Sequence, residues 1–166
     1  MNSPLPANTS GTARLMIDAP SFAVGWQEPV YVPNPAVGGQ WAYTVDGRYC
    51  ERLLAVTHVF TTSAVVGNRY PAVNLADVNG RVITSVPGGG PVVASSVKPC
   101  YLTGGGPAYG DSVPTGVYGF IPDLLIPGGW SWQSSVLGMD AGDEFTGVVL
   151  LVQRFPNDAT QITAGG

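Results

Sequence analysis

Glycine and proline interrupt this chain so often that long helices have little room to form. Its 166 residues include 23 glycines and 15 prolines. After the N-terminal part, the longest stretch that contains neither is residues 48–66, and it is rich in β-branched and aromatic residues, which favour strands. Because glycine and proline also make tight turns, the chain is predicted to consist of short strands joined by turns.

From residue 41 onward, apolar and polar residues alternate with a period of two, as in strands with one buried face. The clearest case is residues 130–137, followed by a turn and a returning strand over residues 145–155. In that returning strand, residues 148–152 are all apolar, which predicts a central strand covered on both faces. We therefore expect an all-β fold with almost no helix, an antiparallel β-sandwich of about seven to nine strands that is jelly-roll-like.

Two local patterns refine this expectation. Asp77-Val-Asn-Gly80 separates two apolar runs and predicts a hairpin with a type I′ turn, because Asn-Gly tolerates positive φ angles. In the long strand within residues 48–66, Leu54, Val56, His58 and Phe60 fall on one alternating face and are expected in the core.

The first 39 residues have a different composition. Prolines recur there at a density that denies a central strand its hydrogen-bond donors, yet apolar residues are interleaved with them. We interpret residues 1–39 as an extended Pro-rich N-terminal arm, residues 40–155 as the β-sandwich domain and residues 156–166 as an exposed tail. The arm is expected to become ordered only against a partner, with Phe22, Trp26 and Tyr31 as its interface anchors, because aromatic side chains dominate interface energetics.

Charged residues are scarce: 11% of the chain, against about 25% in ordinary soluble domains. The net charge is −4 and the seven basic residues are scattered, so nucleic acid is not an expected partner. No apolar run reaches the roughly 20 residues that span a bilayer, and the first residues lack a secretory signal, so no membrane partner is expected. Such an uncharged surface suits a permanent assembly in which much of it is buried.

Reactive groups are few, and no catalytic residue, metal site or cofactor is predicted from them. His58 is the one histidine, no Gly-x-Ser-x-Gly motif is present, and a packed histidine is the favoured interpretation. Asp140, Asp143 and Glu144 form a carboxylate cluster that a glycosidase could use, or that could bind calcium together with Asp123. Turn formation by the aspartates is the simpler explanation.

Cys50 and Cys100 are too few, with one histidine, for a structural zinc site. Spacing leaves a disulfide between them open, although two free, half-buried thiols are favoured.

The four tryptophans allow two interpretations. Trp130 and Trp132 share one face of a predicted strand and could stack on sugar rings, but large aromatic side chains more often fill a core or an oligomer interface.

Several segments resemble the small β-sandwich virion proteins of tailed bacteriophages. These are residues 52–56, residues 66–73, Asp123-Leu-Leu-Ile-Pro-Gly-Gly-Trp-Ser131, and Asp140-Ala-Gly-Asp-Glu-Phe145. The resemblance implies a non-enzymatic decoration or minor capsid protein that binds the major capsid protein or other virion subunits, often as a homotrimer. It would be located in the virion, assembled in the host cytoplasm. The alternative is a tail or fibre component, or a carbohydrate-binding module for host attachment.

Overall fold

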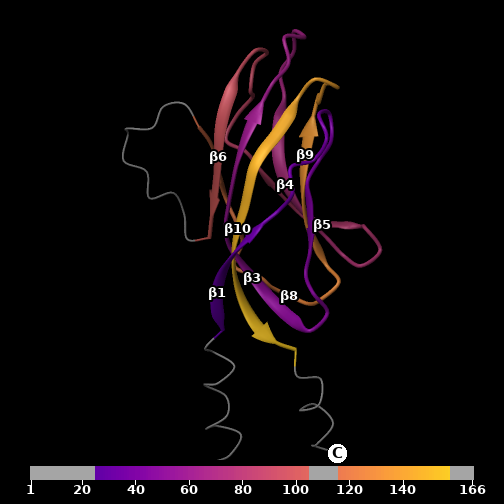
Figure 1. The fold of residues 1–166 in the computed structure, drawn as a ribbon, viewed down its shortest axis with the longest axis vertical. Coiled ribbons are helices and arrows are strands. Elements are labelled where there is room, and N and C mark those ends of the chain that lie inside the picture. The colour runs from indigo at the N-terminus through magenta and orange to yellow at the C-terminus, as the bar shows by residue number, and fades with distance from the viewer. Residues whose placement is uncertain (1–24, 105–115, 158–166) are drawn as a thin grey trace, which may run out of the picture.

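A computed structural model describes residues 25–104 and 116–157 of the chain, and these residues form strands, turns and loops with no helix (Figure 1). The strands are β1 (Trp26–Tyr31), β2 (Ala42–Thr44), β3 (Tyr49–Thr61), β4 (Tyr70–Ala76), β5 (Val82–Pro87), β6 (Val97–Thr103), β7 (Val117–Phe120), β8 (Leu125–Ile126), β9 (Ser131–Leu137) and β10 (Glu144–Pro156). The all-β prediction is confirmed for this part of the chain.

The strands form two sheets around one hydrophobic core. Sheet A has the order β1-β10-β3-β6-β7, with β8 paired to one end of β3, and sheet B has the order β2-β9-β4-β5. Phe60 and Leu150 from sheet A and Leu75 and Trp132 from sheet B belong to the same buried cluster. Burial of alternate residues explains the period-two pattern of the sequence.

The pairing is nested along the chain. β1 pairs with β10, β2 with β9, β3 with β6 and β4 with β5, and successive pairs belong alternately to sheet A and sheet B. These pairs are antiparallel, but β7 runs parallel to β6, so the prediction of a purely antiparallel fold is wrong at this edge. Residues 104–116 separate β6 from β7, a link long enough for the crossover that parallel neighbours need.

Part of the predicted arm belongs to the sheet, because residues 26–31 form strand β1 of sheet A. β1 lies at the edge of sheet A and pairs with β10 along its whole length. The Val32 N–H donates to the Val148 carbonyl, so by alternation the nitrogen of Pro29 faces the open edge, where no donor is needed. An edge position therefore accommodates a proline that a central strand would exclude. Residues 1–24 of the predicted arm lie outside the described residues.

β3 and β10 each contain a bulge that shifts the alternation. Leu54 is skipped in the pairing with β10, so Leu53 lies in the core and Leu54 is only half-buried, contrary to the prediction. Val56, His58 and Phe60 are buried as expected. In β10 the extra residue falls at Gly147, whose φ of +62° suits glycine.

The β4–β5 hairpin is confirmed, but its turn is not type I′. Ser95 is the one described non-glycine residue with positive φ, so Asn79 is not left-handed, whereas Gly80 has a φ of +77°. The Gly80 N–H donates to the Asp77 carbonyl, and the Asp77 carboxylate accepts from the N–H groups of Asn79 and Arg81. This is a type I turn followed by a left-handed glycine.

The position of β10 is as predicted, because it lies between β1 and β3 in sheet A with Val148, Leu150 and Val152 buried. Its opposite face is not covered as expected: Leu151 is 37% exposed. At the end of this strand, the Asn157 N–H donates to the Arg48 carbonyl, and residues 158–166 of the predicted tail lie outside the described residues.

Candidate interaction surface

The outer face of sheet A, which points away from the core, carries many of the exposed apolar side chains of the described residues. The strand registers place alternate residues of each strand on it. It consists of Pro29 and Tyr31 from β1, Val149 and Leu151 from β10, Ala55, Thr57 and Val59 from β3, Val97, Pro99, Tyr101 and Thr103 from β6, Phe120 from β7 and Leu125 from β8. None of these residues is charged.

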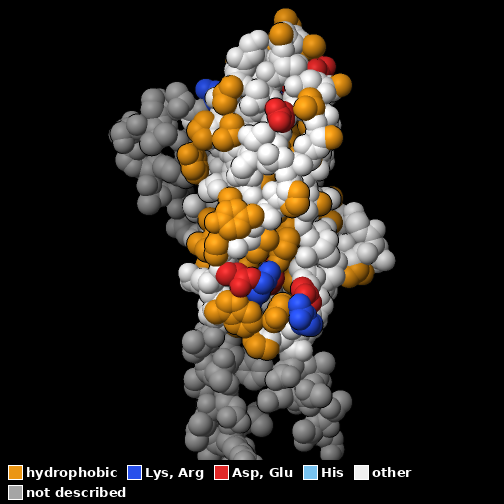
Figure 2. Space-filling model, viewed as in Figure 1, with side chains coloured by type: hydrophobic (Ala, Val, Ile, Leu, Met, Phe, Trp, Pro, Cys, Tyr) orange, Lys and Arg blue, Asp and Glu red, His pale blue; other side chains and the backbone are white. Residues whose placement is uncertain are grey.

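Several of these side chains are well exposed. Tyr31 is 75% exposed, Val97 64% and Phe120 53%. Figure 2 shows hydrophobic side chains gathered over β1 and neighbouring strands, with a small group of charged side chains below them. Two charged residues lie in register with the ends of this face. Glu144 is level with Val97, and Arg52, level with Leu125, forms a 2.8 Å ion pair with Asp123. A continuous exposed apolar surface of this kind marks an interaction site in a soluble protein.

The three predicted anchor residues have different outcomes. Tyr31 lies on the outer face, beside Val149 of β10. Trp26 lies on the opposite side of β1, in register with Arg154, and its ring meets the ring of Tyr49 edge-on at 5.4 Å. Phe22 lies outside the described residues.

A charged cluster links β1 to its neighbours in sheet A and to β2 of sheet B. Arg154 donates to Glu28 of β1, to Glu51 of β3 at 2.6 Å and to the Tyr43 hydroxyl of β2 at 2.9 Å. The Tyr43 hydroxyl in turn donates to Glu51 at 2.8 Å. Burial raises the pKa of Glu51, although the hydrogen bond from Tyr43 opposes this. The cluster joins four strands, β1, β2, β3 and β10, and explains why residues from 25 onward belong to the domain.

The opposite end of the molecule is built around a buried ion pair that sequence analysis missed. The Arg69 Nε donates to the Asp143 carboxylate at 3.1 Å, and both side chains are almost fully buried. Asp143 also accepts from the N–H groups of Ser63 and Asp140, each at 2.8 Å. Burial opposes ionisation of Asp143, but these donors together lower its pKa.

The same ion pair links several loops. The Arg69 guanidinium donates to the carbonyls of Val65 and Gly67, and the Asp143 carbonyl accepts from the Gly38 N–H. The β1–β2, β3–β4 and β9–β10 loops are thereby joined into what we term the loop end. Exposed aliphatic side chains lie on it, with Val66 94% and Leu137 74% exposed. The Arg69–Asp143 pair and its hydrogen bonds to the backbone hold the loops that carry these side chains.

The predicted carboxylate cluster is distributed between turn and ion-pair roles. Asp140 accepts from the Gly142 N–H and from the Ser63 hydroxyl, which is turn chemistry. Asp143 belongs to the ion pair, and Glu144 begins β10. Asp123 pairs with Arg52 near the other end of β3 and does not join them. Among the described residues, no three His, Cys, Asp or Glu side chains are grouped as metal ligands.

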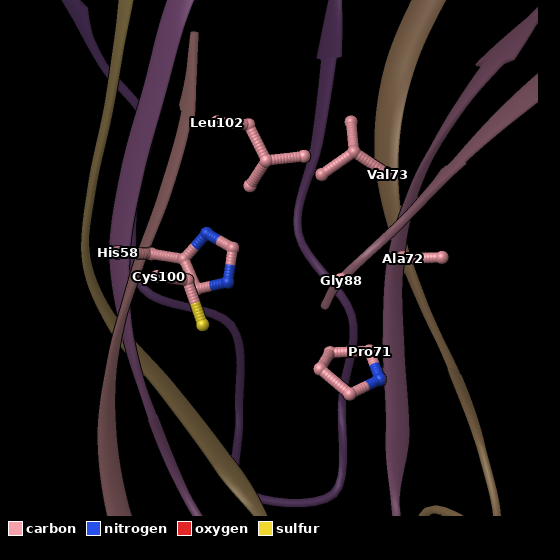
Figure 3. A pocket seen from close by; sticks show the side chains of 7 residues that line it. All are labelled: His58, Pro71, Ala72, Val73, Gly88, Cys100 and Leu102. Carbon is pink, nitrogen blue, oxygen red and sulfur yellow. The ribbon is translucent and has the colours of Figure 1, made fainter. Parts of the chain in front are cut away.

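His58 is a packed core residue, as favoured from the sequence. Its ring contacts the rings of Phe145 and Trp41, and neither ring nitrogen has a hydrogen-bond partner. Burial lowers its pKa to about 4. Figure 3 shows His58 and Cys100, paired across β3 and β6, pointing toward residues of sheet B across a cavity of about 10 Å³. That space is about what one water molecule needs.

The two cysteines are free, as favoured from the sequence. Cys100 lies opposite His58, whereas Cys50 lies eight residues earlier on β3, about 26 Å away along the strand. That separation far exceeds the Cα distance a disulfide can span.

The face shared by Trp130 and Trp132 is turned toward the core, which confirms the favoured interpretation that these side chains fill a core. Trp132 is fully buried, and Trp130 is partly buried against the same core. This overturns the carbohydrate interpretation of that face.

A scan against models of known protein families finds no match, and a search of curated proteins finds none either. No helix in the described part of the chain is long and apolar enough to cross a membrane.

Proposed function

We propose that this chain is a non-enzymatic structural protein of a virion, a capsid decoration or minor capsid protein that stabilises the particle. The observation that carries the proposal is the outer face of sheet A, where apolar and aromatic side chains are exposed and the charged residues in register, Glu144 and Arg52, lie only at its two ends. A surface of this composition is costly to leave in water and is suited to permanent burial between subunits.

The strand order supports a finer proposal, that the fold is a jelly roll. Without β7 and β8, the remaining eight strands pair first with last, second with seventh, third with sixth and fourth with fifth, and the pairs alternate between two sheets. Rolling one long hairpin into two sheets produces this order. Jelly rolls are common in viral capsid proteins and in lectins.

The loop end is the surface we assign to contact with the major capsid lattice. β1 begins and β10 ends at the opposite end of the molecule from the loop end (Figure 1). The buried Arg69–Asp143 pair holds the loops around Val66 and Leu137 in one arrangement, which lowers the entropy lost on binding.

The test is binding of the purified full chain to particles that lack the native copy. Wild-type protein is expected to co-sediment at a fixed stoichiometry, and the double variant Val66→Asp, Leu137→Asp is expected to bind at least tenfold more weakly. Val78→Asp is the matched control, because Val78 is also an exposed aliphatic residue but lies in the β4–β5 turn. Absence of wild-type binding, and of the protein from purified particles by mass spectrometry, would refute a virion role.

A carbohydrate-binding module for host attachment is the second candidate. It is favoured by the exposed rings of Tyr31 and Phe120 on the outer face, because flat rings can stack on sugars. A glycan array distinguishes the two: binding of one glycan class that is lost in Tyr31→Ala would favour this function.

A further inference from the structure

We propose that the outer face of sheet A is covered by the same face of a second copy of this chain, giving a two-fold symmetric dimer. The inference rests on the proposed role in a permanent assembly and names the partner of one of its surfaces. It replaces the trimer suggested by the resemblance, because a face that contacts itself generates a two-fold axis.

The size of the face fits a stable dimer. From β1 to β7 it spans four strand spacings, about 19 Å, and from the level of Val97 to that of Leu125 it spans about 30 Å along β3. The projected area is about 600 Å², and the accessible area of exposed side chains is larger than their projection. A standard interface buries about 800 Å² on each partner.

Charge also favours self-association through this face. The chain carries a net charge of −4, so two copies repel each other wherever acidic groups meet. On the outer face, the one acidic residue among the described strands is Glu144, at the end level with Val97, and the acidic clusters around Glu28 and Asp143 lie on the core side or at the loop end. This is therefore the surface on which two copies approach with the least repulsion.

At the β1 edge of sheet A, the other common route of β association, the addition of a strand, is hindered. Pro29 presents no N–H donor at the centre of the β1 edge, which blocks the addition of another strand there. Stacking of faces remains available, because two sheets of the same twist pack face to face about 10 Å apart.

Leu151 is the residue to change, since it lies in the row that joins Pro29, Ala55, Thr103 and Phe120 near the middle of the face. Sedimentation equilibrium of the full chain is expected to show a monomer–dimer equilibrium for the wild type. Leu151→Glu is expected to weaken dimerisation at least tenfold, and Val78→Glu on the β4–β5 turn is the matched control that leaves it unchanged.

Mixing two variants with opposite charges at position 151 shows whether the substitution disrupts the interface or the fold. Leu151→Glu and Leu151→Lys are each expected to be monomeric, and an equimolar mixture is expected to recover dimer, which misfolded variants could not do. A wild-type chain that is monomeric at 100 µM, or a Leu151→Glu variant that dimerises like the wild type, overturns the inference.

Two further measurements identify any other occupant of the outer face and show whether the dimer and the proposed function fail separately. If the full chain is monomeric but a chain lacking residues 1–24 dimerises, the protein's own N-terminal segment occupies the face, and the inference is wrong. If the wild type is monomeric and binds particles but Leu151→Glu does not, a virion subunit occupies the outer face. The inference of a dimer is then wrong, and the proposed function stands. A dimer that never binds particles supports the inference and refutes the virion role.

Discussion

Acidification is expected to destabilise this protein through His58, the buried imidazole between the sheets. Its pKa is lowered to about 4 in the fold by burial, against about 6.5 in an unfolded chain. Above pH 6.5 the ring is neutral in both states and has no effect. As the pH falls below 6.5 the unfolded chain binds a proton that the folded chain rejects, so the free energy of unfolding decreases.

The size of this loss follows from the separation of the two pKa values. Each pH unit between them costs about 1.4 kcal/mol, so the loss is about 2 kcal/mol by pH 5 and about 3 kcal/mol at pH 4. Below pH 4 the folded state also binds the proton and the loss levels off. For a domain whose total stability is about 5–15 kcal/mol, this is a large fraction.

The assay is urea denaturation of wild type and His58→Leu at intervals from pH 7.5 to pH 4. Asp140 and Asp143, whose pKa values are lowered in the fold, also lose stabilisation in acid, but they are common to both proteins and cancel in the difference. The stability of His58→Leu relative to the wild type is expected to increase by about 3 kcal/mol over this range. Parallel curves would refute the reasoning, because they would show that the folded protein accepts the proton on His58 as readily as the unfolded chain does.

Three further outcomes are expected from the same structure. Asp143→Asn should destabilise the fold by about 3–5 kcal/mol in denaturant titration, because it leaves the buried Arg69 guanidinium without its counter-ion; a loss below 1 kcal/mol would mean that the loop end does not depend on this pair. Leu150→Ala should cost about 2–5 kcal/mol through a core cavity, whereas Leu151→Ala on the outer face should cost much less, and equal losses would contradict the assigned faces of β10. A thiol reagent at pH 8 should label Cys50 in the native protein and Cys100 only after unfolding, because burial raises the pKa of Cys100 to about 12; equal labelling rates measured by mass spectrometry would contradict this.

Local features of the fold could be predicted from the sequence because alternate residues of a strand with one buried face are apolar. The all-β class, the central position of β10 and the burial of Val148, Leu150 and Trp132 follow from that period, and the β4–β5 hairpin follows from Asp77-Val-Asn-Gly80. The alternating pattern does not show, however, where a strand contains one extra residue that exchanges its two faces. The bulge at Leu54 therefore reversed the predicted face of that side chain.

Other features depend on contacts between residues that are distant in the sequence, and these required the tertiary structure. The sequence pattern assigns residues 26–31 to an arm, because the partner of β1, β10, lies more than a hundred residues later. The edge position of β1 is what makes Pro29 acceptable. The Arg69–Asp143 pair joins residues 74 positions apart, and no local pattern marks it. Whether an apolar strand face is buried or exposed depends on what packs against it, so composition predicted a surface for partners, while only the strand order located it on the outer face of sheet A.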